Sequence, residues 1–299
     1  MQTAMLPVVP RPVRHLHSLL MAGKVGSPPV TLGHLHIPKT AGTSLRTAIA
    51  ESLGVRELYF QLGKSRFTDS HSLRLPADGP ARELVLWYPF FSGHMSLGEL
   101  QALNRTSIFA VLTDPRIRLI KQFGWVSRAG LTGSKSILQW LVDAFPIGPE
   151  SSSPVLHLIN NGPRPHDVLQ RPPRWGPRGK VKWIPHTDAD FAQLTKSLIT
   201  IATDSPQDAL NYLFEVELIP SLVRVQHLNA RAEGLAEESV PQDLDLPSVE
   251  AVINQLSLCT STEYRFLDYL EKSQQHYFKL QPVQDESVAA LLLARGLAR

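Results

Sequence analysis

The sequence contains only one cysteine and no apolar run long enough to cross a membrane. Among its 299 residues Cys259 is the single cysteine, which excludes an internal disulfide and is typical of a reducing compartment. No stretch approaches the roughly 20 consecutive apolar residues that a membrane-spanning helix needs. The apolar residues at 16–22 are too few, and too polar at their flanks, for a signal peptide. We therefore expect a cytoplasmic protein.

The sequence also lacks a strong excess of charge of either sign. Its formal net charge is +3 and its pI is about 9.0, which suits anionic ligands but is too weak to indicate nucleic acid. It has no internal repeat and no Cys/His cluster with metal-ligand spacing. A hydrophobic content of 43% and a charged content of 19% are those of an ordinary globular protein. We therefore expect neither a metal nor a nucleic-acid partner.

The most informative stretch is HIPKTAGTS at residues 36–44. A strand candidate at 31–37 precedes it, and apolar residues four apart at 45–53 predict a helix after it. A strand, a tight loop and a helix N-terminus form an anion site, because unpaired N–H groups and the positive end of the helix dipole converge there. The residues that we expect to hold a phosphate are Lys39, Thr40, Ala41, Gly42, Thr43 and Ser44.

Each residue type in this stretch has a reason to be there. Gly42 would let the backbone approach a phosphate, Thr43 and Ser44 add hydroxyl donors, and Lys39 adds a mobile positive charge. The stretch does not match the Walker A pattern, in which the lysine directly follows the second glycine. Here Lys39 comes three residues before Gly42. An ordinary strand-to-helix turn is the alternative interpretation.

The order P-K-T-A-G-T-S resembles the 5′-phosphosulfate loop of sulfotransferases that use 3′-phosphoadenosine 5′-phosphosulfate (PAPS), most closely the carbohydrate 2-O-sulfotransferase branch. The resemblance covers roughly residues 31–280, firmly at three patches. It implies PAPS as co-substrate, no metal, and the sulfotransferase version of the P-loop fold. It also implies that Lys39 neutralises charge on the leaving nucleotide.

A second patch is FFSGHMS at residues 90–96. A histidine at a strand end is well placed to act as a general base near neutral pH. The segment resembles the H-G-H segment of the 2-O-sulfotransferases, whose second histidine is the proposed base and corresponds to His94. The first histidine is Ser92 here. The alternative is a structural histidine that hydrogen-bonds to the backbone.

The third patch follows a strong strand candidate at 107–112. Asp114 should cap a helix that has Pro115 at its first position. Sulfotransferases bind the 3′-phosphate here with R-D-P, x-x-R-L and then a serine. The family arginine is Thr113 in this chain, and the family serine falls at Lys121. Since Lys121 shares a helix face with Asp114 and Arg118, we expect Lys121, helped by Arg116 or Arg118, to supply the missing charge.

A proline-rich and basic segment lies at 163–185. Its arginines can bind anions with paired hydrogen bonds, and its tryptophans can stack on sugar or aromatic rings. We interpret it as a rim for the acceptor, and a solvated surface loop is the alternative. The acceptor-binding candidates are Arg171, Arg174, Trp175 and Arg178.

Strands that alternate with helices predict a three-layer α/β fold with a mainly parallel central sheet. We expect an extended arm at 1–30 and one domain at 31–299, with the basic insertion at about 163–185. Thr260 and Glu263 form a capping-box pattern, which predicts a helix from about 260 to about 278.

The expected reaction is sulfuryl transfer from PAPS to a hydroxyl on a small molecule or carbohydrate, with His94 as general base. Two other functions stay open. One is a kinase or hydrolase on a variant P-loop, which would need Mg²⁺ and a carboxylate near the loop. The other is a non-catalytic binding relative, suggested by the altered residues Thr113 and Lys121. The sequence does not predict the oligomeric state.

Overall fold

The structure is a computed structural model that describes about half of the chain. The described residues are 31–54, 59–60, 72–73, 89–93, 97–101, 105, 107–128, 130, 132, 135–144, 187–226, 246–273, 276–281 and 283–297. The predicted arm at 1–30 and the basic segment at 163–185 lie outside them. Within the described residues, no helix has the length and apolar character needed to cross a membrane.

In the described part of the chain, seven strands form one sheet, and every registered pair of neighbours is parallel. Their order across the sheet is β3-β2-β4-β1-β5-β6-β7. The strands are β1 (Leu32–Leu35), β2 (Tyr59–Phe60), β3 (Ser72–Leu73), β4 (Phe90–Gly93), β5 (Ser107–Leu112), β6 (Ile199–Ala202) and β7 (Tyr277–Phe278).

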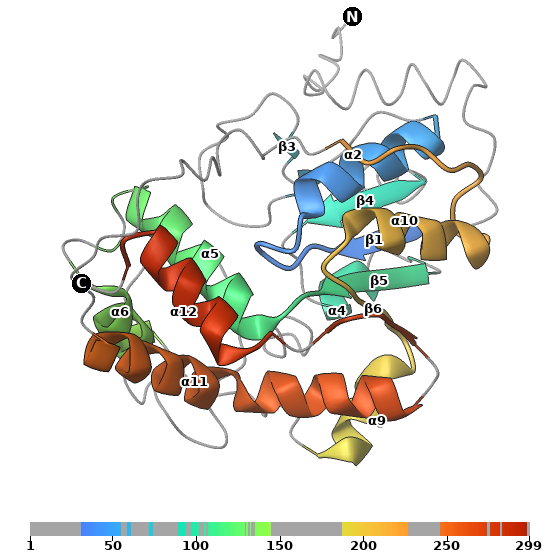
Figure 1. Cartoon of the computed structure of the whole chain (residues 1–299). Coiled ribbons are helices and arrows are strands. Elements are labelled where there is room, and N and C mark those ends of the chain that lie inside the picture. Colours follow the sequence, from blue (N-terminus) through green and yellow to red (C-terminus); the bar gives the residue numbers. More distant parts are fainter. Residues whose placement is uncertain are drawn as a thin grey trace, which may run out of the picture.

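Helices lie on both sides of this sheet (Figure 1). The described helices are α2 (Gly42–Ser52), α4 (Leu97–Gln101), α5 (Pro115–Arg128), α6 (Ile137–Ala144), α9 (Asp188–Thr195), α10 (Pro206–Glu215), α11 (Leu246–Ser273) and α12 (Asp285–Ala294). The α/β fold with a parallel central sheet, predicted from the sequence, is therefore confirmed.

The layers can be read from the side chains of β5, which alternate between two cores. Ile108, Ala110 and Leu112 pack in a cluster with residues of α4, α9 and α11. Phe109 and Val111 pack on the other face with residues of α2 and α10. Because successive side chains of a strand point to opposite faces, one buried strand serves both cores. The sheet is the middle layer of three.

A third core lies among the helices α5, α6, α11 and α12. Its buried residues include Leu119 and Phe123 of α5, Leu141 of α6, Leu256 of α11 and Leu292 of α12. Helices α5 and α12 lie side by side in Figure 1, and α11 runs past both this cluster and the sheet. Helix α11 therefore joins the helical cluster to the central sheet.

Several predicted element boundaries are confirmed, and both ends of one predicted helix are wrong. Asp114 caps α5 as expected, since its Oδ1 accepts hydrogen bonds from the backbone N–H groups of Arg116 and Ile117 at 2.9 and 3.0 Å. The helix predicted at about 260–278 instead begins at Leu246 and ends at Ser273, and Tyr277–Phe278 is strand β7. The Thr260 hydroxyl donates to the carbonyl of Leu256 at 2.7 Å, a bond that threonine can make inside a helix.

The strand order reverses beside β1. The chain leaves β1 through α2 on one face of the sheet, whereas α4, between β4 and β5, lies on the opposite face. Strand β1 has β4 on one side and β5 on the other. In open α/β sheets, ligands bind outside the carboxyl ends of the strands at such a reversal. The carboxyl ends of β1 and β5 are therefore the place to look for a site.

Candidate functional site

The 38–44 segment connects β1 to α2 through two left-handed residues. Lys39 has φ of 69° and Ala41 has φ of 57°, in a region that non-glycine residues seldom adopt. Ala41 is the N-cap of α2, and no side chain caps the helix there. The first turn of α2 thus presents its positive dipole end at the carboxyl edge of the sheet, and the order of strand, loop and helix is the predicted one.

The hydroxyls of this segment have different surroundings. The Thr40 hydroxyl is buried and donates to the carbonyl of Ile37 at 2.9 Å, so it tightens the turn. Ser44 is also buried, whereas the Thr43 side chain is half-buried. Of the three hydroxyls predicted to contact a phosphate, Thr43 is the most accessible.

Gly42 is in close contact with a histidine ring. A Cβ atom built on Gly42 would lie 2.0 Å from both Cδ2 and Nε2 of His36. The φ of Gly42 is not among the positive ones, so the absence of a side chain matters here and left-handed freedom does not. The expectation from sequence is that Gly42 lets the backbone approach a phosphate. In the structure, the His36 imidazole fills the space beside its Cα.

A second buried histidine lies under the same loop. His34 Nδ1 is 2.9 Å from the hydroxyl oxygen of Ser92, and its ring stacks on Phe109 with centroids 4.6 Å apart. The rings of His34 and His36 are stacked at 5.4 Å. Ser92 stands where the resemblance places the first histidine of H-G-H, and its described partner is His34. Polar side chains thus connect β4 to the base of the 38–44 segment.

The ammonium group of Lys39 lies over an aromatic ring. Its Nζ is 5.5 Å from the ring centroid of Trp125 on α5, within the range of a cation–π contact. The loop lysine is thus in contact with the helix that follows β5. Sequence reasoning did not assign a role to Trp125.

The carboxyl end of β5 is held by the buried side chain of Asp114. Its Oδ2 accepts a hydrogen bond from the Tyr264 hydroxyl of α11 at 2.7 Å, while Oδ1 caps α5. Arg116 Nε also donates to the Tyr264 oxygen at 3.0 Å, and its guanidinium pairs with Asp285 of α12. Burial and the bond to Asp114 raise the pKa of Tyr264 well above its ordinary value. Arg116 is therefore committed to α11 and α12.

Arg118 makes a buried ion pair with α11. Its Nη2 donates to both carboxylate oxygens of Glu263 at 3.0 and 2.9 Å, and the two side chains are 4% and 5% exposed. Arg118 Nε is buried and has no hydrogen-bond partner. The carboxylate already balances this guanidinium, which weakens the case for Arg118 as the main phosphate ligand.

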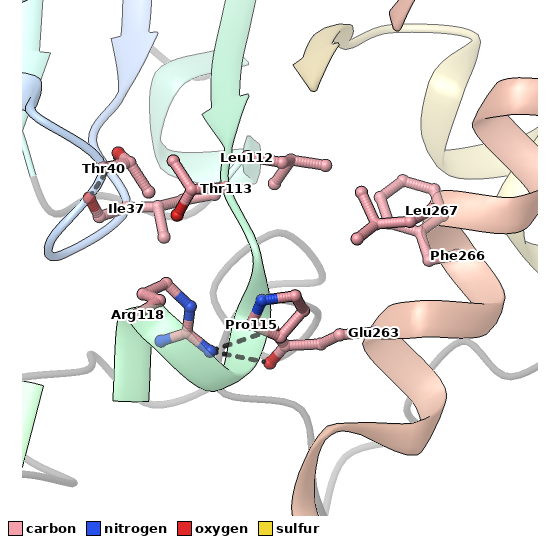
Figure 2. A pocket seen from close by; sticks show the side chains of 9 residues that line it. All are labelled: Ile37, Thr40, Leu112, Thr113, Pro115, Arg118, Glu263, Phe266 and Leu267. Carbon is pink, nitrogen blue, oxygen red and sulfur yellow. Dashed lines mark hydrogen bonds and ion pairs between the residues drawn. The ribbon is translucent and has the colours of Figure 1, made fainter. Parts of the chain in front are cut away.

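The ion pair lines a small pocket at the strand reversal (Figure 2). Figure 2 shows Thr40 and Thr113 on one side of the pocket and the side chains of α11 on the other. It contains about 260 Å³ of space, part of it open to solvent. The lining residues are Ile37, Thr40, Leu112, Thr113, Pro115, Arg118, Glu263, Phe266 and Leu267. The structure thus brings three predicted site residues, Thr40, Thr113 and Arg118, around one pocket.

Lys121 lies one turn further along α5 than Ile117 and is half-buried. It is near Asp204, which follows β6. Partial burial raises the pKa of the Asp204 carboxyl. A hydrogen bond from the backbone N–H of Asp114 and the charge of Lys121 oppose this rise, and the Asp114 carboxylate adds to it. Lys121 therefore carries its charge near the carboxyl ends of β5 and β6, on the helix where the sequence placed it.

His94, Arg171, Arg174, Trp175 and Arg178 lie outside the described residues, so the roles predicted for them stay predictions. Sequence reasoning missed Glu263 and Tyr264 as partners of the 114–118 region. The only local signal for them was the polar and aromatic composition of the helix at 260–270.

The described part of the chain contains no group of three or more histidine, cysteine, aspartate or glutamate side chains that could hold a metal ion. Burial raises the pKa of the Cys259 thiol to about 11, so this sole cysteine of the chain is not a nucleophile near neutral pH. No protein-family model, curated protein or solved structure was found to match the chain.

We predict that Gly42→Ala destabilises the fold by about 1–3 kcal/mol, because the new Cβ would overlap the His36 ring. Chemical denaturation measures this cost. In a His36→Ala background the space is open, and the added cost of Gly42→Ala should fall below about 1 kcal/mol. An equal cost in both backgrounds would show that the ring is not what excludes a side chain at position 42.

Arg118→Met should lower the free energy of unfolding by about 3–5 kcal/mol, because it leaves the buried Glu263 carboxylate without its partner. Replacing both residues by methionine should recover most of the loss. The matched control is Lys135→Met, which removes a surface pair with Asp143 and should cost less than about 1 kcal/mol. Similar losses in Arg118→Met and the control would contradict a structural ion pair.

Proposed function

We propose that this chain is a PAPS-dependent sulfotransferase that moves a sulfuryl group to an acceptor hydroxyl. The observation that carries the proposal is the geometry of the 38–44 segment. Two left-handed residues turn β1 into the uncapped N-terminus of α2, at the carboxyl edge of a parallel sheet. This arrangement suits the 5′-phosphosulfate of a nucleotide, because backbone N–H groups and the helix dipole face the bound anion.

In the proposed reaction the acceptor oxygen attacks sulfur, and the bond from sulfur to the bridging oxygen of PAPS breaks. His94 takes the proton from the acceptor hydroxyl. Lys39 neutralises the charge that grows on the bridging oxygen, and 3′-phosphoadenosine 5′-phosphate leaves. The backbone of Gly42 and the hydroxyls of Thr43 and Ser44 hold the 5′-phosphate. A sulfuryl group carries less negative charge than the terminal phosphoryl group of ATP, so Mg²⁺ is not required.

The 3′-phosphate is read at the start of α5. Because Arg116 pairs with Asp285 and Arg118 pairs with Glu263, neither guanidinium offers an unbalanced charge. Lys121 is then the main cation for the 3′-phosphate, and Thr113 adds one hydroxyl. The sequence alone led us to expect that Arg116 or Arg118 would help Lys121 to bind the 3′-phosphate. The proposal now assigns the 3′-phosphate to Lys121 without the arginines.

The acceptor is a hydroxyl of a small molecule or a carbohydrate. The basic segment at 163–185 binds the acceptor through Arg171, Arg174, Trp175 and Arg178. The choice of a sugar rests on analogy with the 2-O-sulfotransferase branch.

A Mg²⁺-dependent kinase or hydrolase is less well supported. The best candidate for a carboxylate that binds Mg²⁺ is Asp114, because it follows β5, the strand beside β1. However, both of its oxygens already accept hydrogen bonds from the protein. A metal ligand there would have to give up the cap of α5 or the bond from Tyr264. A non-catalytic relative is distinguished by turnover alone.

Calorimetry should show that the protein binds 3′-phosphoadenosine 5′-phosphate more tightly than AMP, and that Mg²⁺ does not change this order. Lys121→Ser should reduce the affinity ratio by about tenfold or more, since a charge-assisted contact is lost. The control is Lys196→Ser, an exposed lysine at the end of α9, which should leave the ratio unchanged. A ratio near one in the wild type, or tight Mg²⁺-dependent binding of ATP, would refute the proposal.

Lys39→Ala should lower turnover by about 10²-fold or more, through lost electrostatic stabilisation of the transition state. His94→Ala should lower turnover by about 10²–10⁴-fold and leave nucleotide affinity nearly unchanged, because a general base contacts the acceptor. Both are measured with PAPS and a panel of carbohydrate and small-molecule hydroxyl acceptors. If His94→Ala weakens nucleotide binding as much as it slows turnover, His94 is a structural residue.

A further inference from the structure

The ammonium group of Lys39 lies over an aromatic ring that belongs to another element. Lys39 Nζ is 5.5 Å from the centroid of the Trp125 ring. Trp125 lies on α5 and is partly buried against the cluster that includes Leu119 and Phe123. Since α5 follows β5 and the lysine follows β1, the contact spans the strand reversal.

A lysine side chain needs such a support to occupy one place. Its ammonium is attached to a flexible four-carbon stem that can adopt many rotamers. The face of an indole ring attracts a cation, and among aromatic side chains tryptophan does so most strongly. A ring also holds the cation without neutralising its charge, as a carboxylate would. The contact therefore restricts Lys39, and the ring itself does not neutralise the charge.

The helix that carries the ring is itself well fixed. Its first turn is capped by Asp114, and the next residues are tied to α11 through Tyr264 and Glu263 and to α12 through Asp285. A site residue is positioned well when its support is a rigid element with satisfied polar groups. Helix α5 meets this condition through bonds to two other helices.

We propose that Trp125 is the positioning residue of Lys39. Its ring holds the Lys39 ammonium beside the N-terminus of α2, where an anion would bind. The role of Lys39 in sulfuryl transfer rests on the function proposed above, whereas the placement of its ammonium by Trp125 does not. On this view Trp125 contacts neither the nucleotide nor the acceptor and acts through Lys39 alone.

The first test is the chemical reactivity of the Lys39 amine, which needs no substrate. Wild type, Trp125→Phe and Trp125→Leu are treated briefly with acetic anhydride at one fixed pH, and mass spectrometry measures acetylation at Lys39. Trp125→Leu should react about two- to thirty-fold faster, since the ring no longer favours and covers the ammonium form. Trp125→Phe keeps a ring face and should react at a rate between the two.

The matched control is Trp140→Leu. Trp140 packs against Phe123 in the same helical cluster, with ring centroids 5.5 Å apart, so its loss disturbs the same core. This variant should leave the Lys39 acetylation rate unchanged. Equal rates in wild type and Trp125→Leu, or equal acceleration in Trp125→Leu and Trp140→Leu, would overturn the proposal.

The second test asks whether the ring acts through the lysine. The conversion of PAPS to 3′-phosphoadenosine 5′-phosphate in water should slow about two- to thirty-fold in Trp125→Leu, mainly in kcat, and recover in Trp125→Phe. In a Lys39→Met background, Trp125→Leu should slow it no further. The same loss in both backgrounds would make Trp125 a purely structural residue.

The two proposals can fail separately. A wild-type protein that does not bind 3′-phosphoadenosine 5′-phosphate contradicts the sulfotransferase proposal, while the acetylation rates still decide whether Trp125 positions Lys39. Normal PAPS turnover with unchanged acetylation in Trp125→Leu overturns the role of Trp125 and leaves the sulfotransferase proposal intact.

Discussion

The buried carboxylate of Asp114 is the constraint on which the carboxyl edge of the sheet depends. One oxygen caps α5 and the other accepts from Tyr264, so a single side chain fixes where α5 starts and where α11 crosses it. A buried carboxylate is costly unless both oxygens are satisfied, and here they are. Arg118 and Lys121 take their positions from the helix that this cap begins, as does Trp125.

The local parts of this arrangement could be predicted from sequence. The buried strand at 107–112, the Asp114 cap and Pro115 at the first helical position follow from short-range rules, and the structure contains all three. The capping-box pattern at Thr260 and Glu263 failed because it satisfies a local rule inside a longer helix. Buried apolar residues at Val249, Val252 and Leu256 continue the helix before it.

The contacts that complete the candidate site could not be predicted, because they join residues far apart in the chain. Glu263 is 145 positions from Arg118, and Tyr264 is 150 from Asp114. Nothing in a local pattern pairs these residues, since the pairing depends on where α11 packs. The His36 ring against Gly42 shows the same limit at short range. The sequence contains the glycine, but it does not show that the His36 ring lies against it, because that contact depends on the turn between β1 and α2.

The cations at the carboxyl edge of the sheet, of which Arg118 lines the pocket, have two kinds of partner. Arg116 and Arg118 are each paired with a carboxylate and serve to hold helices together. Lys39 rests on a neutral ring, and Lys121 lies near Asp204, whose carboxyl has a raised pKa through partial burial. An ion pair balances the charge of each arginine, whereas the Trp125 ring does not balance the charge of Lys39. In the sulfotransferase site that we propose, Arg116 and Arg118 would therefore hold α5 against α12 and α11, and Lys39 and Lys121 would contact the bound nucleotide.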